Sequence, residues 1–181
     1  MGKHNQGFTL LELIIVVVIL GITLAMAGPS LSRVISDNRV STTANDFVAA
    51  MQFAKAESAA RVTPVTLCKR SVDGTGCVGG GDWSQGWIVF ADTNGDAGVT
   101  AGEVILLSQE ALDNRIVMGG TNGVNTSITY RPAGTTSVTA TEMITVCDDR
   151  GFDTYARGIL VTITGRGNVM KAKDTGLNAC L

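Results

Sequence analysis

The sequence predicts an α+β protein in which one long N-terminal helix packs on a β-rich globular head. Residues 8–27 are apolar apart from one charge, and the residues that follow repeat apolar side chains at the spacing of an amphipathic helix. Beyond residue 62, short runs rich in Val, Ile and Thr alternate with Gly-rich turns, which is typical of twisted strands. The 181 residues fit one soluble domain behind the helix, and a formal net charge of −2 gives no overall basic field for nucleic acid.

The first predicted element is a transmembrane helix over residues 8–28. The apolar stretch from Phe8 to Ala27 is just long enough to cross a bilayer as a helix. Glu12 is its only charge, and a carboxylate in lipid is costly enough to need a specific role. The alternatives are a secretory signal peptide cleaved after Ala27, and a plain anchor in which Glu12 complements the helix dipole. A signal-peptide core is normally shorter and uncharged, which disfavours the first alternative.

The amphipathic half of the helix is predicted over residues 29–62. Proline removes a helical hydrogen bond, so we expect a kink at Pro29, after which the helix resumes at once. Apolar residues recur at helical spacing from Leu31 to Ala54 and are expected to face the head. The helix is expected to end near Pro64, which gives it a length of about 80 Å.

The head, residues 63–181, is predicted to contain eight short strands, with no internal repeat and no long linker. Turn-rich segments separate the runs of strand-forming residues. The predicted strands are Val65–Cys68, Gly86–Ala91, Val104–Gln109, Ile116–Met118, Ser127–Tyr130, Met143–Asp148, Ala156–Ile163 and Val169–Lys173.

Four cysteines lie in the head, an even number that is consistent with two disulfides in an exported domain. Four cysteines allow three connectivities. We favour Cys68–Cys77, which closes the Gly-rich loop 69–76, and Cys147–Cys180, which ties the C-terminal tail to a strand. Zinc is the alternative, but the spacing offers no paired C-x₂-C unit.

The segment Gly7-Phe8-Thr9-Leu10-Leu11-Glu12 resembles the leader and mature N-terminus of type IV pilins and type II secretion pseudopilins. In that family a prepilin peptidase cleaves after the glycine, and the new N-terminal phenylalanine is methylated. The resemblance implies that residues 1–7 are a leader ending at Gly7 and that Phe8 becomes the methylated N-terminus. It also implies a single-pass protein of the bacterial inner membrane with a periplasmic head. A disulfide near the C-terminus is also typical of the family.

The same resemblance gives Glu12 a role in assembly. Cleavage creates an α-amino group with an unperturbed pKa of about 8, which is largely charged at neutral pH. Buried among packed helices, that cation needs a partner, and Glu12 of a neighbouring subunit can supply it. We therefore expect Glu12 and the kink at Pro29 to serve contacts with other pilins or pseudopilins, while membrane lipids surround the helix before assembly.

Several segments of the head resemble the GspH/FimT group of minor pilins. The matching pieces are Phe53–Ala59, Thr66–Cys68, Asp82–Phe90 and Asp92–Asp96. The resemblance implies a minor pilin that helps to initiate or cap a type IV pilus used in adhesion, twitching motility or DNA uptake. A pseudopilin of a type II secretion system is the alternative, because both machines use the same helical spine. Trp83 and Trp87 are expected to pack in the head, not to bind a ligand.

The composition argues against an enzyme. The only histidine, His4, falls in the predicted leader, so the mature chain has none for a catalytic triad or a histidine metal site. Gly79-Gly80-Gly81 lacks the Lys-Ser/Thr of a phosphate-binding loop. We therefore expect a structural protein with no cofactor, calcium being the one candidate.

One acidic segment follows the oxygen-ligand spacing of an EF-hand calcium loop. The candidate ligands are Asp92, Asn94, Asp96 and, at the twelfth position, Glu103. Ala97 replaces the glycine of the sharp sixth-position turn, and strands, not helices, are expected on both sides. The favoured interpretation is a hairpin loop whose Asp and Asn side chains bond their own backbone.

A basic group near the C-terminus is the candidate DNA site. FimT-like proteins of natural transformation are associated with DNA binding through a G-R-x-R element, which Gly165-Arg166-Gly167-Asn168 resembles. Lys171 and Lys173 follow it, but Asn168 stands where the second arginine would contact phosphate. A turn between strands with solvated charges is favoured over a DNA-binding site.

Overall fold

The computed structural model describes residues 7–152 and 154–181, apart from the side chains of residues 25–30. Residues 1–6 of the predicted leader, including His4, lie outside the described residues. The chain divides into two compact units, Met1–Asn38 and Arg39–Leu181, and each has its own internal contacts.

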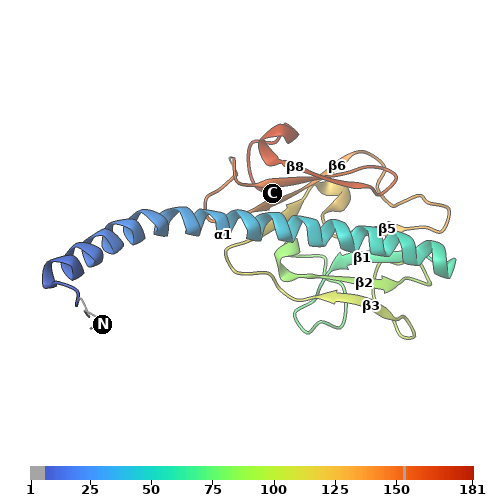
Figure 1. The fold of residues 1–181 in the computed structure, drawn as a ribbon. Coiled ribbons are helices and arrows are strands. Elements are labelled where there is room, and N and C mark those ends of the chain that lie inside the picture. The colour runs from blue at the N-terminus through green and yellow to red at the C-terminus, as the bar shows by residue number, and fades with distance from the viewer. Residues whose placement is uncertain (1–6, 153) are drawn as a thin grey trace. The chain divides into compact units, whose positions relative to one another are not determined.

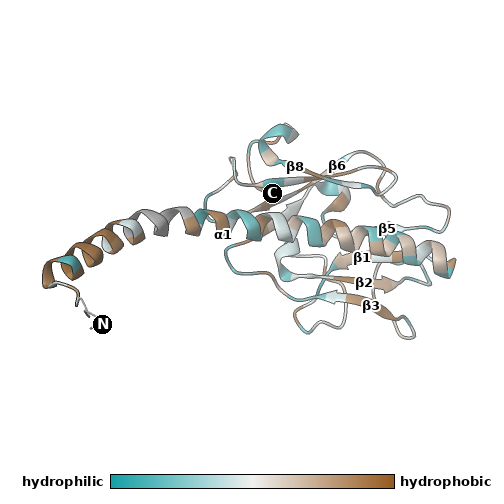
Figure 2. Ribbon diagram, viewed as in Figure 1, coloured by the Kyte–Doolittle hydropathy of each residue, from teal (hydrophilic) through white to brown (hydrophobic). Residues whose placement is uncertain are grey.

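Helix α1, Leu10–Arg61, is the long helix predicted from the sequence and runs through both units. Its backbone is helical at Pro29, whose side chain is not described, so the kink there stays a prediction. The large apolar side chains from Phe8 to Leu24 are exposed, with exposed fractions between 49% and 87%. Figure 2 shows the same segment as predominantly hydrophobic. Among the described residues, no helix reaches the length and hydropathy of a membrane-crossing segment.

The head unit contains two four-stranded antiparallel sheets. Strands of both sheets are labelled in Figure 1. The first has the order β3-β2-β1-β5, and the second has the order β4-β6-β7-β8. The strands are β1 (Val65–Lys69), β2 (Trp87–Ala91), β3 (Ile105–Gln109), β4 (Val117–Gly120), β5 (Ser127–Tyr130), β6 (Glu142–Cys147), β7 (Arg157–Val161) and β8 (Gly167–Lys171).

All eight predicted strands occur, and the errors of two residues in their bounds lie at the end of β4, at the end of β7 and at both ends of β8. Strand β7 ends at Val161 and not at Ile163, because the amide of Thr162 donates to the Arg166 carbonyl and closes a turn. Strand β8 therefore begins and ends two residues earlier than predicted, and Lys173 lies in a 3₁₀ helix. The unpredicted 3₁₀ helices are η1 (Trp83–Gln85), η2 (Asn122–Val124) and η3 (Ala172–Thr175).

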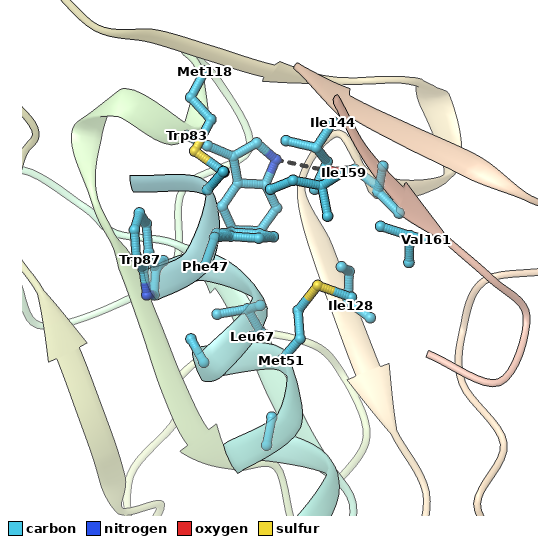
Figure 3. Close-up of a cluster of buried hydrophobic side chains, with 14 of the residues drawn as sticks. Phe47, Met51, Leu67, Trp83, Trp87, Met118, Ile128, Ile144, Ile159 and Val161 are labelled. Atoms are coloured by element: carbon cyan, nitrogen blue, oxygen red, sulfur yellow. Dashed lines mark hydrogen bonds between the residues drawn. The ribbon is translucent and has the colours of Figure 1, made fainter. Parts of the chain in front are cut away.

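The core of the head forms where the second half of α1 meets the two sheets. The buried apolar helix residues are Val40, Ala44, Phe47, Ala50, Met51 and Ala54, so the packed stripe begins at Val40, whereas Leu31, Val34 and Ile35 are exposed. The Phe47 ring makes edge contacts with Trp83 and Trp87, at centroid distances of 5.0 and 5.1 Å (Figure 3). The Trp83 indole Nε1 donates to the Val124 carbonyl oxygen over 3.0 Å. The predicted packing role of both tryptophans is confirmed.

Both favoured disulfides are present. Cys68–Cys77 closes a loop directly after β1, and Cys147–Cys180 joins the end of β6 to the C-terminal tail. The tail lies against the second sheet, where the Leu181 amide donates to Thr145 Oγ1 over 3.0 Å. A Cβ at Gly119 would stand 2.2 Å from the Leu181 carbonyl oxygen, so only glycine allows this approach.

The C-terminal cap of α1 contains a residue, Val62, in an unfavourable backbone conformation. Val62 follows the last helical residue with φ of 54°, the left-handed region in which a β-branched side chain is strained. The next amide, that of Thr63, donates to the Ser58 carbonyl oxygen over 3.3 Å, which is the long bond of a Schellman cap. Glycine is the usual residue at this position of the cap.

We predict that Val62→Gly stabilises the head. Glycine adopts the left-handed conformation without strain, and the Val62 side chain is 77% exposed, so little packing is lost. The expected gain in the free energy of unfolding is about 1 kcal/mol, or about 3 °C in Tm, measured by thermal unfolding of the full chain in detergent. Val62→Ala keeps a Cβ and serves as the control with a smaller gain. A lower Tm for Val62→Gly would contradict the cap as described.

Candidate functional site

The N-terminus of α1 carries a reciprocal cap that involves the predicted assembly residue. The Thr9 amide and the Thr9 hydroxyl each donate to Glu12 Oε2 over 3.1 Å. In return, the Glu12 amide donates to Thr9 Oγ1 over 3.2 Å. This is a capping box, in which the residue before the helix and the third helical residue satisfy each other's backbone amides.

The predicted processing junction lies immediately before this cap. Gly7 and Phe8 are exposed and precede the first helical residue, so the peptide bond between them is not part of the helical hydrogen-bond ladder. Phe8 is 87% exposed. The sequence did not identify the role of Thr9, although the spacing Thr-x-x-Glu before an apolar run is the signal for it.

The acidic segment forms the connection between β2 and β3, so both of its flanks are strands, as expected. Asp92 is fully buried and is held at the start of this loop. It accepts a 2.7 Å hydrogen bond from Thr66 Oγ1, a 2.7 Å bond from the Gly95 amide and a 3.2 Å bond from the Ala97 amide. Ala97 has φ of 60°, so the loop makes the sharp left-handed turn without the glycine that an EF-hand uses.

Glu103 closes the other end of the loop. Its two carboxylate oxygens accept from the Thr93 amide over 2.8 Å and from the Thr100 amide over 2.9 Å. Slight burial raises the pKa of Glu103, but these hydrogen bonds outweigh it and leave the pKa below its usual value. The carboxylate is therefore ionised at neutral pH.

Three of the four calcium candidates come together in this loop. One oxygen from each of Asp92, Asp96 and Glu103 lies within 4.8 Å of the others. Asn94 is turned to the loop itself: its Nδ2 donates to Asp96 Oδ2, and its Oδ1 accepts from the Asp96 amide. The carboxylates are thus already bonded to their own loop, which is the favoured hairpin interpretation, and calcium binding stays a prediction.

The three basic residues of the candidate DNA site are spread from the turn before β8 to η3. Arg166 lies in the turn before β8, whereas Lys171 ends β8 and Lys173 lies in η3. Five residues of extended strand separate Arg166 from Lys171 by about 16 Å. All three side chains are exposed, so each can meet phosphate from solvent.

A buried lysine that the sequence analysis did not single out fixes the disulfide-closed loop. Lys69 is fully buried at the end of β1, and its Nζ donates to the carbonyl oxygens of Gly81, over 2.8 Å, and Gly79, over 3.3 Å. Burial lowers the pKa of Lys69, and the nearby charge of Asp82 partly opposes that shift. The sequence signal was a lysine placed directly after the predicted strand Val65–Cys68.

The pilin-like class of proteins is defined by one long N-terminal helix followed by an antiparallel β-sheet head. This chain has that fold, and an exposed glycine-phenylalanine junction precedes its helix cap. The N-terminal segment matches the prokaryotic N-terminal methylation motif over residues 2–28. The model of the type II transport protein GspH matches residues 43–167, which is more than half of the chain. The chain belongs to the GspH family.

Solved structures share the fold. The type IV minor pilin FimU of Pseudomonas aeruginosa superposes with a TM-score of 0.59 at 16% identity, covering 80% of this chain and 96% of that chain. The minor pseudopilin EpsH from the type 2 secretion system of Vibrio cholerae superposes with a TM-score of 0.51 at 8% identity, covering 74% and 97%. No curated protein sequence matches the chain.

We predict that Asp92→Ala destabilises the head by about 3 kcal/mol, because two backbone amides and one hydroxyl lose a buried acceptor. Asp96→Ala, at an exposed carboxylate of the same loop, is the matched control with an expected change below about 0.5 kcal/mol. Thermal unfolding is measured with EDTA and with millimolar calcium. If Asp92→Ala is harmless in EDTA and harmful only with calcium, the loop is a metal site and not a self-bonded hairpin.

Proposed function

We propose that this chain is a non-catalytic minor pilin of a type IV pilus that helps to initiate or cap the fibre. Its N-terminal helix anchors it in the bacterial inner membrane with the head in the periplasm, and other pilins later surround the same helix. The observation that carries this proposal is the exposure of the apolar side chains from Phe8 to Leu24 in a chain whose head has a filled core. A helix that is apolar all round needs lipid or other helices around it.

The junction before the helix supports the same role. Cleavage by prepilin peptidase after Gly7 leaves the apolar helix attached to the head and creates a positively charged amine on Phe8. Glu12 is the only carboxylate in the apolar segment, so it is the partner that a neighbouring subunit offers to this amine. A shifted axial register would leave both charges unpaired, so the pair favours one stagger between subunits.

A pseudopilin of a type II secretion system is the second candidate. It is supported by the match of residues 43–167 to the type II transport protein GspH. The two candidates share the anchored helix and the fibre contact and differ in the machine that uses them. DNA binding by the head has weaker support, because Arg166 and Lys171 lie at opposite ends of β8.

We predict that Glu12→Ala and Glu12→Gln both insert into the membrane but enter the fibre at least about tenfold less than the wild type, because each leaves the neighbour's amine unpaired. Glutamine can still complete the capping box with Thr9, so Glu12→Gln separates helix capping from charge pairing. The measurement is the ratio of this chain in sheared fibres to that in membranes. Asp149→Asn, at an exposed head residue, is the control. Normal incorporation of Glu12→Gln would show that Glu12 acts only as a cap.

The choice between the two machines has its own test. Deleting the gene is expected to reduce the number of surface fibres, counted by electron microscopy, while protein secretion into the medium continues. Re-expression of the wild-type chain restores the fibres if the effect is direct. Loss of secreted proteins with a normal number of surface fibres would contradict the pilus role and favour the pseudopilin.

A further inference from the structure

Strand β3 is a free edge of the first sheet. It pairs with β2 on one side, and no strand in the described part of the chain lies on its other side (Figure 1). Its residues are Ile-Leu-Leu-Ser-Gln, without the lysine or proline that commonly protects an edge from pairing with another chain. The β2–β3 ladder shifts register only between Val89 and Phe90, so Leu107–Gln109 is regularly paired.

A groove of about 330 Å³ lies between this edge and the helix. Its walls are Asp46, Ala49 and Phe53 on α1, and Trp87, Leu107 and Gln109 on the sheet. Leu107 pairs with Val89 and Gln109 with Trp87, so both side chains point to the helix-facing side of the sheet. We call β3 and these groove walls the β3 groove. A further strand added beside β3 would place alternate side chains over the groove while its backbone completes the sheet.

The β3 groove has one charged wall. Asp46 is exposed, and its side chain makes no hydrogen bond or ion pair with any other described residue. A carboxylate beside the apolar walls of Phe53 and Leu107 favours a ligand with one cation and neighbouring apolar side chains. The groove therefore fits an extended segment that carries a Lys or Arg opposite Asp46.

We propose that the β3 groove binds an extended, apolar segment with one Lys or Arg from the head of a neighbouring, different fibre subunit, by strand addition to β3. The proposal rests on the proposed fibre role. Packing of the N-terminal helices holds neighbouring heads close together, and this tethering gives a high effective concentration that favours contacts too weak to form between free proteins.

The test uses the full chain in cells that assemble the fibre. A photo-crosslinking amino acid, p-benzoylphenylalanine, replaces Ser108, which is exposed on the face of β3 away from the groove. The same amino acid at Val17 of α1 reports fibre assembly independently of the head. Asp46→Lys is combined with each position, and Asp149→Lys, at an exposed residue outside the β3 groove, is the matched control.

We expect Ser108 to capture one defined segment of another subunit, identified by mass spectrometry, that contains a Lys or Arg among apolar residues. Asp46→Lys should lower this yield at least about fivefold without changing capture at Val17, and replacing the partner's cation by Asp should restore it. Capture of a second copy of this chain, capture unaffected by Asp46→Lys, or no capture at Ser108 while Val17 crosslinks would each overturn the proposal. Absence of capture at both positions would contradict the fibre role itself, and the β3 groove proposal falls with it.

Discussion

The exposed apolar surface of the first half of α1 is the constraint on which the rest of the structure depends. Large apolar side chains between Leu10 and Leu24 are exposed on every side of the helix, so a single packed face cannot cover them. The head does not need this segment for its own core, because that core is built from residues after Asn38. The apolar segment therefore needs lipid or other helices around it, and the charges at its N-terminus need partners in the same environment.

The second half of α1, unlike the first, is part of the core of the head. From Val40 onward, the helix contributes one buried stripe. Phe47 contacts Trp83, which lies in the segment that joins β1 to β2, and Trp87, which begins β2. The disulfide Cys68–Cys77 and the buried Lys69 hold that segment in place. A disulfide loses its stabilising effect when reduced, so this arrangement suits an oxidising compartment outside the cytosol. Covalent and polar restraints thus fix the loop that carries the aromatic contact with the helix.

The sequence predicted the elements because their periodicities are local. The long helix and the eight strand runs follow from spacing and turn residues. The two cysteine pairs were favoured, among three possible connectivities, from loop size and from the family resemblance. The order of strands in the two sheets, the burial of Lys69 and the displacement of Lys173 into η3 depend on contacts between distant residues. The acidic loop was predicted only in part. The spacing of Asp92, Asp96 and Glu103 indicated that their carboxylates come together, but their bonds to particular backbone amides could not be derived from ligand spacing alone.

The capping box and the proposed contact between subunits use different parts of Glu12. Both hydrogen bonds from Thr9 end on Oε2, and no donor in the described residues reaches Oε1. A carboxylate has about four lone-pair sites, so Oε1 can still accept from a neighbouring amine. The cap also fixes the side-chain rotamer, which reduces the entropy lost when that amine binds. Thr9 therefore orients Glu12 for the proposed contact, and a local role of Glu12 at the helix N-terminus is compatible with a role in assembly.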